Sequence, residues 1–205
     1  MEKKTVFTPD EVLWIANFSR KYGVRDILIK MILLVEDKRF LKHRGIDFIA
    51  IIRATIINIK YLGIKQGAST ISQQLSALEN KKTSLCKGKM RNKMKKLLGA
   101  IKIESIFSKE EILCEYLNKV YFGKSYFGIH AAANGYFHCK PNYINTARSF
   151  FLAERIALPN KVRIDRIERI LKRPEVRAFF NKKDLNELKV IYKDIFGITI
   201  HIRKY

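Results

Sequence analysis

The feature that most constrains the fold is the helical spacing of apolar residues along nearly the whole chain. Apolar side chains recur three and four residues apart in most segments, which is the repeat of one face of an α-helix. In the first segment, Thr8, Pro9 and Glu11 predict an N-terminal capping box. Gly23 is expected to end that helix. The 205 residues therefore predict a mostly α fold, either as one large domain or as one domain with an extension.

Other segments carry the same helical pattern or its end signals. Pro159 predicts a break after the last helix of the central part, and the chain beyond about residue 163 is charged and amphipathic. The final "ITIHIRKY" alternates like a short strand. The predicted helices cover residues 25–42, 46–62, the segment entered from "KQGASTISQQL", 108–123, 127–137 and 144–157.

The net charge of +22 limits the classes of partner. Such a charge attracts nucleic acid, an anionic membrane surface or a phosphate-bearing substrate. Residues 81–102 contain nine Lys and Arg, and no acidic residue lies between Glu79 and Glu104. This run is either a solvated helix face or a site for a polyanion or diphosphate. Only the charge favours nucleic acid, so nucleic acid is not expected as a partner.

The cysteines and the apolar runs bear on disulfides, zinc sites, signal peptides and membrane-spanning helices. Cys86, Cys114 and Cys139 are odd in number, far apart and without CxxC spacing, so we expect neither a disulfide framework nor a zinc site. The N-terminus "MEKKTVFTPDEV" has no apolar signal core. The most apolar run, 48–64, is interrupted by Arg53 and Lys60. Its uncharged stretches are therefore too short to predict a spanning helix.

Two stretches could carry chemistry. "VEDKRFLKHRG" follows the apolar run "ILIKMILL"; if the helix continues through it, Glu36, Phe40 and His43 share one face. The alternative is a solvated helix end. The second stretch, 66–74, begins with small residues and enters a helix whose free N–H groups would suit a phosphate. The alternative is an ordinary capped amphipathic helix. The polar side chains of this second stretch are Ser69, Thr70, Gln73 and Gln74.

Together these stretches resemble the peptidoglycan glycosyltransferases, the transglycosylase domain of class A penicillin-binding proteins and monofunctional transglycosylases. The first family motif is E-D-x-x-F-x-x-H-x-G and the second is G-x-S-T-I-T-Q-Q, in which Ser72 replaces a Thr. A third block, residues 110–137, also resembles the family, and the likeness covers about 25–160. The matching motif residues are Glu36, Asp37, Phe40, His43, Gly45, Gly67, Ser69, Thr70, Ile71, Gln73 and Gln74.

The resemblance implies a lysozyme-like helical domain with a small jaw, residues 46–64, that contacts the membrane. The implied reaction polymerises lipid II into glycan strands, with release of undecaprenyl pyrophosphate. Glu36 would be the general base, and Lys93 a contact to the diphosphate. The implied substrate-binding residues are Asp37, Phe40, His43, Ser69, Thr70, Gln73, Gln74 and Lys93.

The chain departs from the family where a second carboxylate is expected. Lys96 replaces that acid and Asn92 replaces an Arg. We therefore predict a catalytic role for Lys96 beside Glu36, and leave open both a divalent cation and a weakened activity. The alternative function is a degenerate, non-catalytic protein that binds lipid II or the cell wall.

The predicted organisation has three parts: a helical segment at 1–24, the glycosyltransferase domain at 25–162 and a basic helical extension at 163–205. The family implies a peripheral position on the outer face of the bacterial cell membrane. The expected partners are lipid II, the nascent glycan strand, the membrane surface and other cell-wall enzymes.

Overall fold

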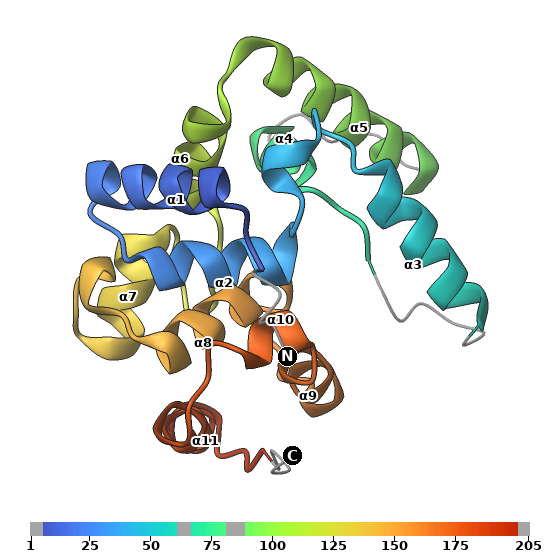
Figure 1. Cartoon of the computed structure of the whole chain (residues 1–205). Coiled ribbons are helices and arrows are strands. Elements are labelled where there is room, and N and C mark those ends of the chain that lie inside the picture. The colour runs from blue at the N-terminus through green and yellow to red at the C-terminus, as the bar shows by residue number, and fades with distance from the viewer. Residues whose placement is uncertain (1–5, 61–66, 81–88, 201–205) are drawn as a thin grey trace. The chain divides into compact units, whose positions relative to one another are not determined.

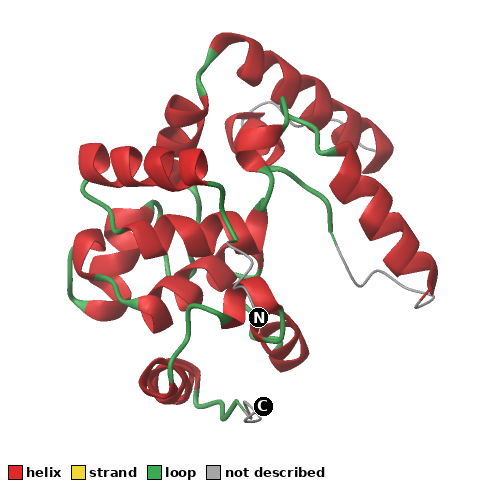
Figure 2. Cartoon of the chain, viewed as in Figure 1, coloured by secondary structure: helices red, strands yellow, loops and turns green. Residues whose placement is uncertain are grey.

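The computed structural model describes residues 6–60, 67–80 and 89–200, with the backbone alone for residues 89 and 90 (Figure 1). Over these ranges the chain is helices joined by loops, with no strand and one isolated bridge between Tyr121 and Phe127 (Figure 2). The predicted mostly α fold is confirmed. The α-helices are α1 Pro9–Tyr22, α2 Asp26–Glu36, α3 Phe48–Lys60, α4 Ile71–Glu79, α5 Lys89–Ile106, α6 Lys109–Lys119, α7 Ile129–Phe137, α8 Thr146–Ala157, α9 Ile164–Leu171, α10 Pro174–Arg177 and α11 Lys182–Phe196; the 3-10 turns are η1 Phe40–Lys42 and η3 Pro141–Tyr143.

Local capping explains where several helices begin and end. The Thr8 hydroxyl accepts the Glu11 N–H, and the Glu11 carboxylate accepts the Thr8 N–H, as the sequence predicts. Ser108 and Glu111 form the same reciprocal box at the start of α6. Gly23 ends α1 with φ +62°, a left-handed conformation that favours glycine.

The predicted helix 25–42 is wrong at its C-terminal end, because α2 ends at Glu36. The chain then turns, and only Phe40–Lys42 form a 3-10 turn. Asp37 directs this turn, since its carboxylate accepts the distant Ile71 N–H and contacts His43. Glu36 and His43 therefore do not share a helix face.

Further boundaries differ from the predicted ones. The predicted helix 108–123 is wrong at its C-terminal end, because α6 ends at Lys119 and Val120 is already extended. Helix α3 starts at Phe48 rather than at residue 46, because the Asp47 carboxylate caps it by accepting the Ala50 N–H at 2.9 Å. Residues 198–200 are not a strand, and the rest of the predicted strand, 201–205, lies outside the described residues. The first part of the basic run, 81–88, also lies outside them.

The chain divides into two compact units, residues 1–35 with 121–205, and residues 36–120. In the first unit α8 packs against α7 and α11, and its Phe150 and Phe151 are fully buried. In the second unit α4 packs against both α5 and α6 (Figure 1). The predicted boundaries at residues 24 and 162 stay predictions.

A buried charged cluster ties α9 and α11 to α8. The Glu154 carboxylate, which is fully buried, accepts hydrogen bonds from Arg155, from Arg166 at 3.1 Å and from the Tyr192 hydroxyl at 3.0 Å. A buried carboxylate is tolerated only when it is paired in this way. The segment after residue 163 is therefore integrated into the first unit through side chains of α9 and α11.

The same segment also reaches α2. Arg173, between α9 and α10, donates from Nη2 to the Leu34 carbonyl at 2.6 Å. That carbonyl lies in the last turn of α2, where helix carbonyls lack intrahelical partners and the helix dipole favours a cation. The guanidinium thus caps the helix that ends at Glu36.

In the second unit, α4 and α5 approach closely. A Cβ added at Gly99 would lie 2.0 Å from the Ser76 Oγ and 3.1 Å from the Ser76 Cβ, so a larger residue here would force the Ser76 side chain to move. Helix α3, by contrast, buries only Ala54. None of the described helices combines the length and the apolar character needed to cross a bilayer.

Candidate functional site

Glu36, the last residue of α2, is held by a chain of two hydrogen bonds. Its Oε2 accepts the Gln74 Nε2 at 2.9 Å, and the Gln74 Oε1 accepts the Tyr116 hydroxyl at 2.7 Å. Tyr116 is fully buried on α6, and burial, followed by the charges of Glu36 and Asp37, raises the pKa of its hydroxyl well above the usual range. A phenol that keeps its proton is a constant donor. It fixes the Gln74 amide so that its nitrogen faces Glu36.

Asp37 joins the end of α2 to the start of α4. It is 6% exposed, and its Oδ2 accepts the Ile71 N–H at 3.0 Å. His43 Nε2 lies 3.0 Å from both carboxylate oxygens and donates to them. A carboxylate at a helix N-terminus also gains from the helix dipole. Asp37 thus fixes the loop that carries His43.

A second set of hydrogen bonds in the site centres on the Gly45 carbonyl and involves Thr70 and Gln73. The Thr70 hydroxyl donates to that carbonyl at 2.7 Å and accepts the Gln73 N–H at 3.2 Å, while the Gln73 Nε2 donates to the same carbonyl at 3.3 Å. Gly45 has φ +85°, and a Cβ there would lie 3.0 Å from the Ala100 backbone. Both facts require glycine. Thr70 and Gln73 are buried, so their polar groups position the loop.

A lysine lies against the aromatic residue of the first motif. The Lys109 Nζ is 4.5 Å from the Phe40 ring centre and 2.6 Å from the Glu104 Oε1. Glu104 also accepts the Ser72 hydroxyl. Burial lowers the pKa of Lys109, and the opposing influence of the nearby carboxylates, Glu104 first, only partly offsets it. This places a partly desolvated cation beside Phe40.

Seven predicted site residues are brought together within residues 36–74, and three are not placed against them. Ser69 is exposed just before the N-cap of α4, and Lys93 and Lys96 are exposed on α5. Among the described contacts, none connects these three to Glu36. Their roles stay predictions. The residues brought together are Glu36, Asp37, Phe40, His43, Thr70, Gln73 and Gln74.

Sequence reasoning missed Tyr116, Glu104 and Lys109 as members of this site. Tyr116 lies in the "EYLN" part of the third block, which is the signal that could have found it. Glu104 and Lys109 lie five residues apart across the break between α5 and α6, a spacing that no regular helix brings together.

The arrangement suits proton abstraction. Glu36 is a carboxylate at a helix end, oriented by a neutral amide and only partly exposed. A positioned carboxylate of this kind can accept a proton from a hydroxyl group that comes within hydrogen-bond reach. Over the described residues, no three His, Cys, Asp or Glu side chains cluster as a metal site would require.

Comparison with known proteins identifies several relatives. The family model described as transglycosylase matches residues 17–180. Penicillin-binding protein 1A of Rickettsia prowazekii is 36% identical over 149 residues, which is 70% of this chain and 18% of that protein. Penicillin-binding protein 1A of Aquifex aeolicus is 42% identical over 113 residues, 54% of this chain and 15% of that protein. Penicillin-binding protein 4 of Bacillus subtilis is 35% identical over 136 residues, 64% of this chain and 20% of that protein. The chain thus spans a fifth or less of the length of these relatives.

Proposed function

Because the chain belongs to the transglycosylase family, we propose that it is a peptidoglycan glycosyltransferase that polymerises lipid II. The observation that carries this proposal is the Glu36 carboxylate, held at 2.9 Å by Gln74, which is itself held by the buried Tyr116. An oriented carboxylate is what a glycosyl transfer to a sugar hydroxyl requires. The products are a longer glycan strand and undecaprenyl pyrophosphate.

In this mechanism Glu36 acts on the acceptor sugar. Its carboxylate takes the proton of the 4-hydroxyl group as the oxygen attacks the anomeric carbon of the lipid-linked donor. The bond from that carbon to the pyrophosphate oxygen breaks, and the electron pair leaves with the pyrophosphate. Attack from the face opposite the leaving group inverts the configuration. A positioned base contributes on the order of 10²–10⁴ in rate.

The departing pyrophosphate needs positive charge. Lys93 and Lys96 are exposed on α5, where their ammonium groups are accessible to an anionic substrate. Lys96 stands where family members have an acid, and an ammonium is a compact charge that can bind phosphate oxygens directly. We assign Lys93 and Lys96 to this role. Ser69, exposed before α4, would add a neutral donor in the donor cleft.

A lipid-linked substrate requires contact with the membrane, and α3 supports that part of the proposal. Its exposed side chains include Phe48 at 68%, Ile56 at 61% and Ile59 at 69%. Apolar side chains of this size bind the interfacial region of a bilayer when they are presented on one helix, and nearby Lys and Arg strengthen the attachment to anionic lipid. We therefore propose a peripheral position on the outer face of the cell membrane.

A non-catalytic protein that holds lipid II is the second candidate. Lys96 and Asn92 favour it, because both replace residues that the family uses around the leaving group. The contacts of Glu36 favour an enzyme, because a binding protein would not need an oriented carboxylate. Turnover decides between the two.

The test is polymerisation of fluorescent lipid II by the full chain and by Glu36→Gln. We expect measurable turnover for the unchanged chain and a loss on the order of 10²–10⁴ for Glu36→Gln, with the same circular dichroism and thermal unfolding. Glu79→Gln is the matched control, because Glu79 is an exposed glutamate on α4. Binding of lipid II without turnover by the unchanged chain would favour the second candidate. Full activity of Glu36→Gln would exclude Glu36 as the base.

A further inference from the structure

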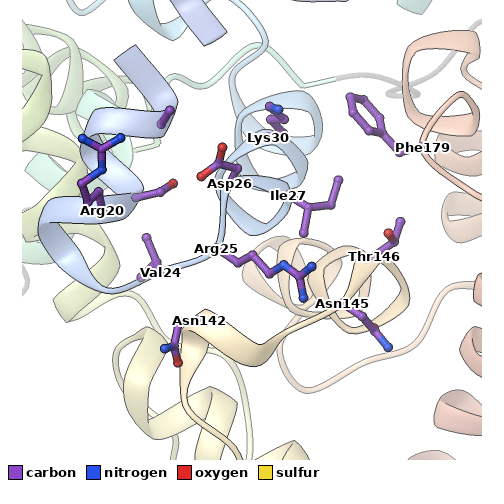
Figure 3. A pocket seen from close by; sticks show the side chains of 12 residues that line it. Arg20, Val24, Arg25, Asp26, Ile27, Lys30, Asn142, Asn145, Thr146 and Phe179 are labelled. Carbon is purple, nitrogen blue, oxygen red and sulfur yellow. The ribbon is translucent and has the colours of Figure 1, made fainter. Parts of the chain in front are cut away.

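The unit formed by residues 1–35 and 121–205 contains a cavity of about 690 Å³. Its walls come from α1, the turn into α2, the first turns of α2 and the start of α8, together with Asn142 of η3 and Phe179, which follows α10 (Figure 3). None of its lining residues belongs to the family motifs. From its charge, its buried hydroxyl and its apolar wall, we infer that this cavity binds a small phosphate monoester.

Positive charge dominates the lining. Arg20, Arg25 and Lys30 contribute three cations, and Asp26 is the one carboxylate among the described lining residues. None of the three cations forms an ion pair with a residue in the described part of the chain. Figure 3 shows the Arg25 guanidinium extended toward Asn145 and Thr146. Three cations that line one cavity without an ion-pair partner attract an anion, and guanidinium groups match phosphate oxygens in geometry.

A buried hydroxyl in the lining provides an independent observation. Ser19 is 4% exposed, and its Oγ has no hydrogen-bond partner among the described residues. A polar group buried without a partner is unfavourable, and most such groups in folded proteins are satisfied by protein, water or ligand. A phosphate oxygen in the cavity would satisfy this hydroxyl once the Ser19 side chain turns toward it, because the Oγ is covered in this structure.

The start of α8 adds a third favourable element. This helix has 12 residues and begins at Thr146, so its positive dipole end and the Thr146 side chain line the cavity. The Asn145 side chain is already used, since it accepts the Arg148 N–H and donates to Glu187. Thr146, rather than Asn145, is therefore the group of α8 that is available to a ligand.

The apolar part of the lining indicates an ester rather than free phosphate. Val24, Ile27 and Phe179 line the cavity together with the polar groups. Pockets for small organic molecules have volumes of about 300–1,000 Å³ and combine apolar walls with a few polar groups. A phosphate monoester with a body the size of a sugar would use both parts of this surface.

Calorimetric titration of the full chain tests the inference with three phosphates and one uncharged sugar. Inorganic phosphate, glucose 1-phosphate and dihexanoyl phosphatidic acid share the phosphate, and glucose lacks it. We expect both esters to bind more tightly than inorganic phosphate, and glucose not to bind. Tighter binding of the sugar ester would assign a soluble ligand, and tighter binding of the lipid would assign a lipid headgroup. No binding of either ester would overturn the inference.

Variants separate the cavity from the general positive charge. Arg25→Gln with Lys30→Gln should weaken ester binding about tenfold or more, because hydrogen bonds to charged groups are lost. Lys182→Gln with Lys183→Gln removes the same charge from exposed positions on α11 and should leave binding unchanged. Equal weakening by the two pairs would show attraction by net charge alone, and would overturn the inference.

Ser19→Ala tests the hydroxyl by itself. It should weaken ester binding while thermal stability in the absence of ligand stays equal or rises, because a buried group without a partner is removed. Unchanged binding in Ser19→Ala would exclude Ser19 from the ligand contacts. A fall in stability without ligand would show that the hydroxyl already has a structural partner, and would contradict the argument.

Discussion

At the scale of single residues, Gln74 determines how the candidate base is presented. An amide can donate only from its nitrogen and accept only at its oxygen. Since Tyr116 donates to the Gln74 oxygen, the nitrogen must face Glu36. The orientation of the carboxylate therefore depends on a residue of α6 that does not touch it.

Tyr116→Phe removes the hydroxyl and keeps the ring in the core. The Gln74 amide then loses the bond that fixes it, and we expect kcat for lipid II polymerisation to fall about tenfold or less, in line with one hydrogen bond of ~1 kcal/mol. KM should change little, because the substrate-facing groups remain. The matched control is Tyr121→Phe, whose hydroxyl also donates to an amide oxygen, that of Asn160, at 3.2 Å. Equal losses in the two variants would contradict a positioning role for Tyr116.

Lys96 carries a second prediction at this scale. If its ammonium takes the place of a metal-holding acid, turnover by the unchanged chain persists in chelator. Lys96→Glu then creates a requirement for a divalent ion, because a carboxylate must bind a cation before it can approach a pyrophosphate. Both are measured as lipid II polymerisation with and without EDTA. Metal-dependent turnover of the unchanged chain would show that the proposed role of Lys96 is wrong.

The sequence identified the residues of this site better than it identified their contacts. Glu36, Gln74 and His43 could be named from their motifs, because motif letters record which chemical groups are present. The bond from Tyr116 to Gln74 spans 42 residues, and the bond from Ile71 to Asp37 spans 34. Such pairs depend on how separate helices pack, and the periodicity of one helix contains no information about that packing.

At the scale of helices, the same limit explains the error after α2. The apolar period continues past Glu36, so the sequence favours a longer helix. The tertiary contacts of Asp37 override this preference. A buried carboxylate needs hydrogen-bond partners, and those of Asp37 are the Ile71 N–H and His43. The starts of α1 and α6 were predictable because their capping residues lie within three positions of one another.

At the scale of helices, we predict that the exposed apolar side chains of α3 attach the chain to anionic membranes. Ile52→Asp with Ile59→Asp places two charges on side chains that are 60% and 69% exposed, so the fold should persist. Co-flotation with anionic vesicles at low salt should be lost, because a charged group is unfavourable in the apolar part of the interface. Leu13→Asp with Val190→Asp makes the same change at exposed positions outside α3 and should float normally. Normal flotation of the α3 pair, or an equal loss in the control pair, would contradict the assignment.

At the scale of the whole molecule, buried tyrosines determine how stability responds to alkali. Burial raises the pKa of Tyr116 and Tyr192 well above the usual range, and raises that of Tyr136 to about 12. The folded chain holds these phenolic protons, while the unfolded chain loses them near pH 10. Stability is therefore lost as pH rises above ~10, by up to ~1.4 kcal/mol per pH unit for each tyrosine.

Denaturant unfolding between pH 9 and 12 measures this slope. Tyr192→Phe and Tyr116→Phe should each reduce the loss of stability per pH unit by the contribution of one tyrosine, whatever their effect on stability at neutral pH. Tyr143→Phe is the control, because Tyr143 is 67% exposed. The lowered pKa of Lys109 acts in the opposite direction, since the cost of burying its ammonium disappears as pH approaches 10.5. An unchanged slope in both buried-tyrosine variants would contradict the argument.

The bond from Arg173 to the Leu34 carbonyl joins residues 139 positions apart. During synthesis at 5–20 residues per second, Arg173 follows Leu34 by on the order of ten seconds. For that interval the end of α2, next to Glu36, exists without its cap, and long-range contacts of this kind also slow folding. The C-terminal end of α2, which carries the candidate base, can therefore complete its hydrogen bonds only late in synthesis.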